Sequence, residues 1–148
     1  MIDATIIPLD FWQAPQGDVI LVYSEHECSI YFACWKSAAV PADFIGHLSF
    51  ERASCVRSFG REYLPYRFQS TSHHSYILQI PDSELLREHV AYRKIHYPNS
   101  PANLLDRNHY VVKGHDIYHE ILARDFTAST IPKQDLTDPR LLRLIAYA

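Results

Sequence analysis

Two neighbouring β-prone segments constrain the fold of this chain more than any other feature. Residues 18–24 read DVILVYS and residues 28–35 read CSIYFACW, and both are rich in β-branched and aromatic side chains. The three residues between them leave room only for a tight connection, so we expect an antiparallel hairpin. Alternation along the second segment puts one set of side chains on the face that we predict to be the core, namely Cys28, Ile30, Phe32 and Cys34.

Further strands are expected along the first half of the chain. Residues 44–52 alternate again, with Phe44, Leu48 and Phe50 on one side and His47, Ser49 and Glu51 on the other. We expect residues 54–59 to continue this strand past a β-bulge near Ala53. Residues 63–69 contain a proline, which cannot donate to a ladder and suits only an edge strand. Residues 75–80 form a better strand, and the SHHS sequence at 72–75 is expected to be a polar loop before it.

The hydrophobic period changes to that of a helix after Pro81. Apolar or amphipathic positions fall at 85, 86, 89, 90 and 93 or 97, and Ser83 or Asp82 can cap the amino end. This pattern predicts one main helix over about 83–94. A cluster of leucines after Asp138 and Pro139 predicts a short C-terminal helix.

The predicted class is therefore α+β and β-rich, with an antiparallel sheet curled into a sandwich or barrel. The 148 residues, 47% of them hydrophobic and 21% charged, suit a single globular domain over 1–148. Three cysteines without Cys-x-x-Cys spacing indicate free thiols and no disulfide. With no signal sequence and no apolar run of membrane-spanning length, we expect a cytoplasmic protein that does not enter a membrane.

The stretch KGHDIYHEILARDF, residues 113–126, poses the clearest chemical question. On a helix, His115 and His119 would be neighbours able to share a metal ion, whereas on a strand one ion could not bridge them. The strand interpretation explains more residues, because Gly114 and His115 can form a two-residue type II′ turn. That turn would place His109 opposite Glu120. We therefore favour a hairpin over the short helix, and predict no metal or other cofactor.

Arginine and aromatic side chains interleave through residues 52–68, which is the strongest local binding signal. The candidate binding residues are Arg52, Arg57, Arg61, Tyr63, Tyr66 and Arg67. Such a mixture can stack bases and hold phosphates in single-stranded RNA, but it can equally form a protein interface or cover a β core. A net charge of −3 supplies no general attraction for nucleic acid, so a nucleic-acid partner is disfavoured.

We expect a non-enzymatic binding module for a protein partner or for self-association. Its interface would draw on residues 52–68 and on the 98–108 loop. The alternative is a small enzyme, with or without a metal, whose acid–base groups come from His109, His119 and Glu120. No Gly-x-Ser-x-Gly elbow, phosphate-binding glycine loop or His-Glu-x-x-His motif occurs in the sequence, which disfavours the enzyme classes with those signatures.

Overall fold

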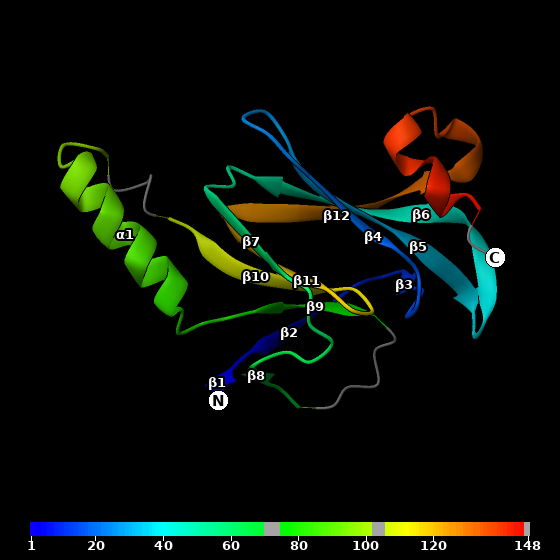
Figure 1. Cartoon of the computed structure of the whole chain (residues 1–148), viewed down its shortest axis with the longest axis horizontal. Coiled ribbons are helices and arrows are strands. Elements are labelled where there is room, and N and C mark those ends of the chain that lie inside the picture. Colours follow the sequence, from blue (N-terminus) through cyan, green and yellow to red (C-terminus); the bar gives the residue numbers. More distant parts are fainter. Residues whose placement is uncertain (70–74, 102–105, 147–148) are drawn as a thin grey trace.

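The computed structural model describes residues 1–69, 75–101 and 106–146, which form two antiparallel sheets packed face to face (Figure 1). One sheet has the order β2-β9-β10-β11-β7, and the other has the order β12-β6-β5-β3 with β4 also paired to β5. The first sheet comprises β2 (Thr5–Pro8), β9 (Tyr76–Gln79), β10 (Asn108–Lys113), β11 (Tyr118–Ala123) and β7 (Cys55–Phe59). The second comprises β12 (Asp125–Pro132), β6 (Val40–Glu51), β5 (Cys28–Ser37), β3 (Trp12–Gln13) and β4 (Val19–Tyr23).

The predicted β-rich α+β class is confirmed, and the described strands form a sandwich rather than a closed barrel. A parallel pair, β1 (Ile2–Asp3) and β8 (Tyr66–Arg67), lies outside the two main sheets, so the segment with the proline does supply only a two-residue strand. The helical elements are α1 (Glu84–His96), η2 (Lys133–Asp135) and η3 (Pro139–Leu144). The predicted C-terminal helix is thus present, as a 3-10 helix whose amino end is capped by Asp138.

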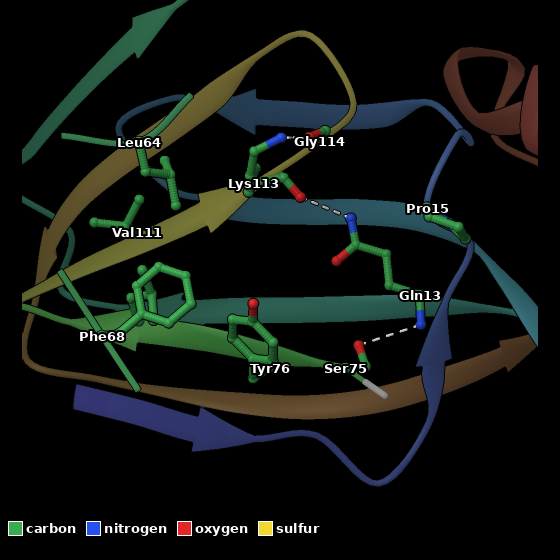
Figure 2. Close-up of a pocket in the computed structure, with 10 residues that line it drawn as sticks. Gln13, Pro15, Leu64, Phe68, Ser75, Tyr76, Val111, Lys113 and Gly114 are labelled. Atoms are coloured by element: carbon green, nitrogen blue, oxygen red, sulfur yellow. Dashed lines mark hydrogen bonds between the residues drawn. The ribbon is translucent and has the colours of Figure 1, made fainter. Parts of the chain in front are cut away.

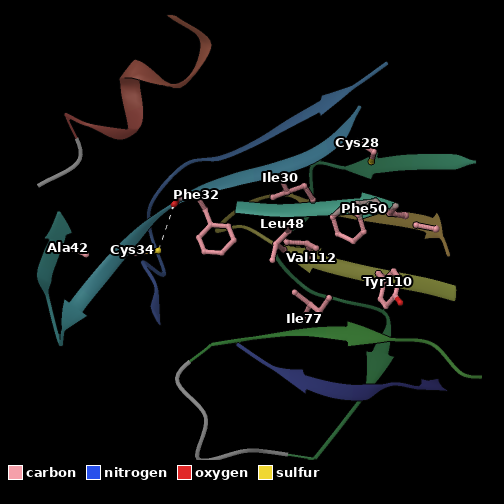
Figure 3. Packing of buried hydrophobic residues seen from close by; sticks show 12 residues of the cluster. Cys28, Ile30, Phe32, Cys34, Ala42, Leu48, Phe50, Ile77, Tyr110 and Val112 are labelled. Atoms are coloured by element: carbon pink, nitrogen blue, oxygen red, sulfur yellow. Dashed lines mark hydrogen bonds between the residues drawn. The ribbon is translucent and has the colours of Figure 1, made fainter. Parts of the chain in front are cut away.

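The main core lies between the two sheets, as Figure 3 shows. The predicted hairpin is β4 paired with β5, and the four predicted inward side chains of β5 all enter this core. Gly46 of β6 lies opposite Phe32, and a Cβ there would overlap the Phe32 ring and lie 2.9 Å from Phe11. The aromatic rings therefore occupy the space that any larger residue at position 46 would need.

Two short connections carry the chain from one sheet to the other at a shared corner. β6 leads into β7 through Arg52, which has a left-handed backbone with φ of 52°, and β11 leads into β12 through Arg124. The Arg124 amide donates to the Glu51 carbonyl at 2.9 Å, which ties the two crossings together. The prediction that residues 54–59 continue the strand of residues 44–52 in one sheet is wrong, because β7 pairs with β11 instead. The turn at Arg52 redirects the chain to a partner distant in sequence.

Residues 108–123 form a hairpin, as predicted, but its register differs. The loop has four residues, with the Gly114 amide donating to the Ile117 carbonyl at 2.7 Å, and Lys113 pairs with Tyr118. Gly114 does not have the positive φ that a type II′ turn requires. His109 therefore lies opposite Leu122, and Glu120 opposite Val111. Because the shift is two residues, every side chain keeps the face predicted for it.

The main helix, α1, projects beyond one end of the sheets (Figure 1). Ser83 caps it by accepting a hydrogen bond from the Leu86 amide at 2.9 Å, as predicted. The helix has no fully buried residue, and the side chains between 84 and 94 that are partly buried are those at 85, 86, 89, 90 and 93. The helical period selected the first four of these positions and left the fifth open between 93 and 97. Arg93 is the partly buried one, and Tyr97 is exposed.

Candidate functional site

A buried ionic network centres on Glu120 of β11. Its side chain is 1% exposed and accepts hydrogen bonds from Arg57 on β7 and from the Tyr66 hydroxyl on β8. His109 on β10 lies beside it, with its Nε2 atom 3.2 Å from Glu120 Oε1. Three strands and the covering segment at residues 60–69 therefore meet at one carboxylate, on the face of the first sheet that points away from the main core.

The network keeps Glu120 ionised. Burial alone would raise the pKa of this carboxyl, but hydrogen bonds from His109, Arg57 and Tyr66 outweigh burial and lower the pKa to about 2. The same contact with Glu120, added to burial, raises the pKa of the Tyr66 hydroxyl. With these pKa values, Glu120 stays ionised and accepts the hydrogen bond, and Tyr66 stays protonated and donates it.

His109 also links the network to the amino end of α1. Its Nδ1 atom is 2.7 Å from the Ser83 hydroxyl, so Ser83, His109 and Glu120 follow one another in the order of a hydrolase triad. Ser83 and His109 are only 4% and 3% exposed, however. A substrate could reach neither side chain unless the elements above them moved. The geometry anchors the helix cap to the sheet.

His119, the other predicted catalytic residue, lies on the opposite face of β11 from Glu120. Its Nδ1 atom is 2.6 Å from the Ser58 hydroxyl, its Nε2 atom is buried without a hydrogen bond, and burial lowers its pKa. The structure thus brings His109 to Glu120 but leaves His119 in the main core. His115 lies exposed in the turn, 3.9 Å from the Asp116 carboxylate.

No group of three or more histidine, cysteine or acidic side chains within the described ranges could hold a metal ion. The histidines at positions 73 and 74 of the predicted polar loop lie outside those ranges. The cysteines at 28, 34 and 55 are all free thiols. Burial raises the pKa of Cys28 to about 11 and that of Cys34 to about 12, which suits a structural role in the core.

The arginine and aromatic residues predicted from 52–68 divide among several environments. Arg57 and Tyr66 turn inward to Glu120, Arg67 pairs with Asp3 at 2.6 Å, and Arg61 stacks over the Phe59 ring at 4.7 Å. Tyr63 is exposed. Arg52 belongs to the corner between the sheets. The segment 60–69 mainly covers the outer face of the first sheet, through Leu64, Tyr66 and Phe68.

A cavity of about 220 Å³ lies between that covering segment and the sheet, as Figure 2 shows. Leu64, Phe68 and Val111 form its apolar wall, and Lys113 is the charged residue in the described lining. Gln13 closes one side, since its amide donates to the Lys113 carbonyl at 2.8 Å. The described lining includes no histidine, and the volume is below the roughly 300 Å³ at which small-molecule sites begin.

The edge strand β12 is a feature that the sequence analysis missed. It pairs with β6 over all eight of its residues, and within the described ranges no other strand pairs with it. Residues 127–130 are all exposed. The available signal was weak, since residues 127–130 read TAST and only Phe126 and Ile131 are large apolar side chains that would support a strand.

Comparison with protein-family models, with curated proteins and with solved structures finds no match to this chain. Within the described residues, no helix combines the length and the apolar character needed to cross a membrane.

Proposed function

We propose that this protein is a non-enzymatic binding module that associates with a second copy of itself through the free edge of β12. The observation that carries the proposal is an eight-residue edge strand, regularly paired on one side and exposed along its middle. Such an edge presents unpaired amide and carbonyl groups in the spacing that another strand can match.

Natural edge strands are usually blocked against pairing by inward charges, lysine, proline, bulges or short length. Between Phe126 and Ile131, β12 has none of these features, since the four residues there are Thr, Ala, Ser and Thr. Its only charged residue is Asp125 at the start, and its only proline is Pro132 at the end. The backbone of β12 can therefore pair with another strand over its centre, whereas Asp125 and Pro132 limit pairing at its two ends. This arrangement suits one partner strand of defined length.

The chain itself supplies a matching strand. A two-fold axis normal to the sheet, passing midway between Ser129 and its copy in the partner, would keep the inner faces of both copies continuous and pair β12 with its own antiparallel copy. Thr127 would then lie opposite the partner's Ile131, a β-branched pair that suits a sheet surface. Two five-stranded sheets would join into one of ten strands.

Charges at the ends of β12 favour the same register. With Ser129 opposite its own copy, Asp125 of each copy lies next to the partner's Lys133, the residue that follows the strand. Neither side chain forms an ion pair within the described part of the chain. Two opposite-charge pairs, one at each end, therefore support this register over those shifted by two residues.

The alternative enzyme interpretation receives less support from the geometry. Its candidate groups, His109 and Glu120, are buried beneath the covering segment, and His119 lies on the other side of the sheet. The ion pair and hydrogen bonds already use the acceptor atoms of Glu120. A buried, fully bonded network of this kind stabilises a fold and positions an element.

Sedimentation equilibrium over a range of protein concentrations tests the proposal. Wild type should show a monomer–dimer equilibrium. Ser129→Lys should raise the dissociation constant of the dimer at least tenfold, because two lysines would face each other across the axis. A tenfold change requires a loss of only about 1.4 kcal/mol of binding free energy. Thr5→Lys, the same change on the exposed edge strand β2 of the other sheet, is the matched control and should leave the equilibrium unchanged.

The register has its own test. Asp125→Lys should weaken the dimer, and adding Lys133→Asp to it should restore the wild-type equilibrium. A wild-type chain that remains monomeric up to its solubility limit would overturn the proposal. So would a dimer that Ser129→Lys leaves intact.

A further inference from the structure

Four arginines from distant parts of the chain lie near the corner that the two sheets share, where three of them act electrostatically on the fourth, Arg107. Arg52 lies in the β6–β7 crossing, Arg124 in the β11–β12 crossing, Arg107 just before β10, and Arg93 on the inner side of α1. The Asn108 amide donates to the Arg124 carbonyl at 2.8 Å, which holds the start of β10 against the second crossing. The cluster is thus fixed by the corner and by the place where α1 meets β10.

The positive charges are close enough to affect one another. Burial lowers the pKa of Arg107, and neighbouring charges lower it further. Those charges are the guanidinium groups of Arg52, Arg93 and Arg124, opposed by Asp106 alone. The imidazole of His89, one turn before Arg93 on the helix, has its pKa lowered by burial and then by Arg93 and Arg107. A fifth basic group therefore borders the cluster.

Several polar atoms of the cluster are buried without hydrogen-bond partners. They are the Nε atoms of Arg93 and Arg107 and the Nε2 atom of His89. Burying such donors unpaired costs free energy, about 1–3 kcal/mol for each group and more for charged ones. A ligand that accepts hydrogen bonds from these atoms would remove that free-energy cost, so unpaired buried donors are typical of binding sites.

Other arginines in the same chain provide an internal comparison. Arg57, Arg67 and Arg143 each have a carboxylate within 2.9 Å or less, from Glu120, Asp3 and Asp18 respectively. Within the described ranges, the nearest carboxylate contact in the cluster is that of Glu51 with Arg124, at 4.0 Å. Among the described residues, Arg52, Arg93 and Arg107 have no carboxylate partner. Residues 102–105, which lie outside the described ranges, read ANLL in the sequence and carry no charge.

We propose that Arg52, Arg93, Arg107 and Arg124 form a binding site for a phosphate-type oxyanion. Guanidinium groups bind phosphate oxygens in pairs of parallel hydrogen bonds, so a few of them can enclose one multiply charged group. The anion neutralises the repulsion among the arginines and accepts from their unpaired Nε atoms. The site lies at the corner that precedes β12 and uses residues of one chain only.

Inorganic pyrophosphate is the probe for this site. Isothermal titration and thermal unfolding are measured at constant ionic strength, with chloride as the reference anion. Pyrophosphate at about 100 times its dissociation constant should raise the Tm of wild type by about 5 °C or more. Arg107→Gln should weaken binding at least tenfold.

Arg107→Gln also gives a readout that a purely structural arginine would not. Because the change relieves repulsion in the empty site, its Tm in chloride should equal or exceed that of wild type, while the response to pyrophosphate disappears. Arg87→Gln is the matched control, since Arg87 lies on α1, the helix that carries Arg93, but is exposed and paired with Asp82. It should bind pyrophosphate as wild type does.

Three outcomes would overturn the anion site. They are a wild-type Tm that does not respond to pyrophosphate, equal loss of binding in the Arg107→Gln and Arg87→Gln variants, and binding of a single-stranded RNA oligonucleotide without any binding of pyrophosphate. Repeating the titration in the Ser129→Lys variant separates anion binding from self-association. Undiminished binding in that variant is the expected result, and loss of binding there would contradict a site built from one chain.

Discussion

Replacing Glu120 with glutamine tests how much the buried ionic network stabilises the fold. Glutamine keeps the size of the side chain and can still bond to Tyr66 and His109, but it removes the charge that faces Arg57. The pKa of Glu120 in the folded chain is about 2, against an ordinary value of 4.5. At about 1.4 kcal/mol per pKa unit, this difference corresponds to about 3 kcal/mol of stability at neutral pH.

The expected loss is smaller than that full value. The Arg57 side chain is 43% exposed, so it can turn toward water once its partner is neutral, and the bonds to Tyr66 and His109 partly survive. We expect Glu120→Gln to lower the free energy of unfolding by about 2 kcal/mol at pH 7. Urea unfolding followed by circular dichroism measures this change directly.

The pH dependence has a definite sign. The folded-state pKa of Glu120 is lowered, so its contribution is complete above the unfolded-state value of 4.5 and is lost as the pH falls toward about 2. The gap between wild type and Glu120→Gln should therefore be constant from pH 7 to about pH 5 and should close progressively below that.

The exposed carboxylate Glu51 provides the control. Its contact with Arg124 is 4.0 Å and its side chain is 61% exposed, so Glu51→Gln should change the stability by no more than about 0.5 kcal/mol. A Glu120→Gln variant as stable as wild type at pH 7 would show that the charge on Glu120 does not stabilise the fold. So would a gap that stays the same at pH 3.

Two further predictions concern the main core. Gly46→Ala should lower the free energy of unfolding in urea by about 1–3 kcal/mol, because the added methyl group would overlap the Phe32 ring. A loss below about 0.5 kcal/mol, the size of a typical surface substitution, would mean that the ring can move aside. In native protein, a thiol reagent at pH 8 should modify Cys55, which is only partly buried, well before the two cysteines of the main core. Equal labelling of all three thiols before unfolding would contradict the packing of β5.

The local elements of this fold could be predicted from the sequence with good accuracy. The hairpin of β4 and β5, the inward face of β5, the cap at Ser83 and four of the five inner positions of α1 all follow from periodicity and end signals. Each of these features depends on residues that are close together along the chain. Short-range sterics and the burial of one apolar face decide such features.

Features that depend on strand partners could not be predicted. The shift of the β10–β11 register by two residues leaves every side chain on the same face, so alternation cannot detect it. The passage of residues 54–59 into the other sheet depends on the left-handed turn at Arg52 and on pairing with β11, more than 50 residues away along the chain.

The same division applies to the candidate sites. From the sequence alone we could predict a β-rich α+β fold, free thiols on an inner face, and an arginine-rich segment without an obvious role. The tertiary structure sets Arg57 against Glu120 and places Arg52 near Arg93, Arg107 and Arg124. It also left β12 at the edge of its sheet. Charge and hydrogen-bond partners act in space over a few ångströms, whereas sequence spacing specifies which residues are close only within a single helix or strand.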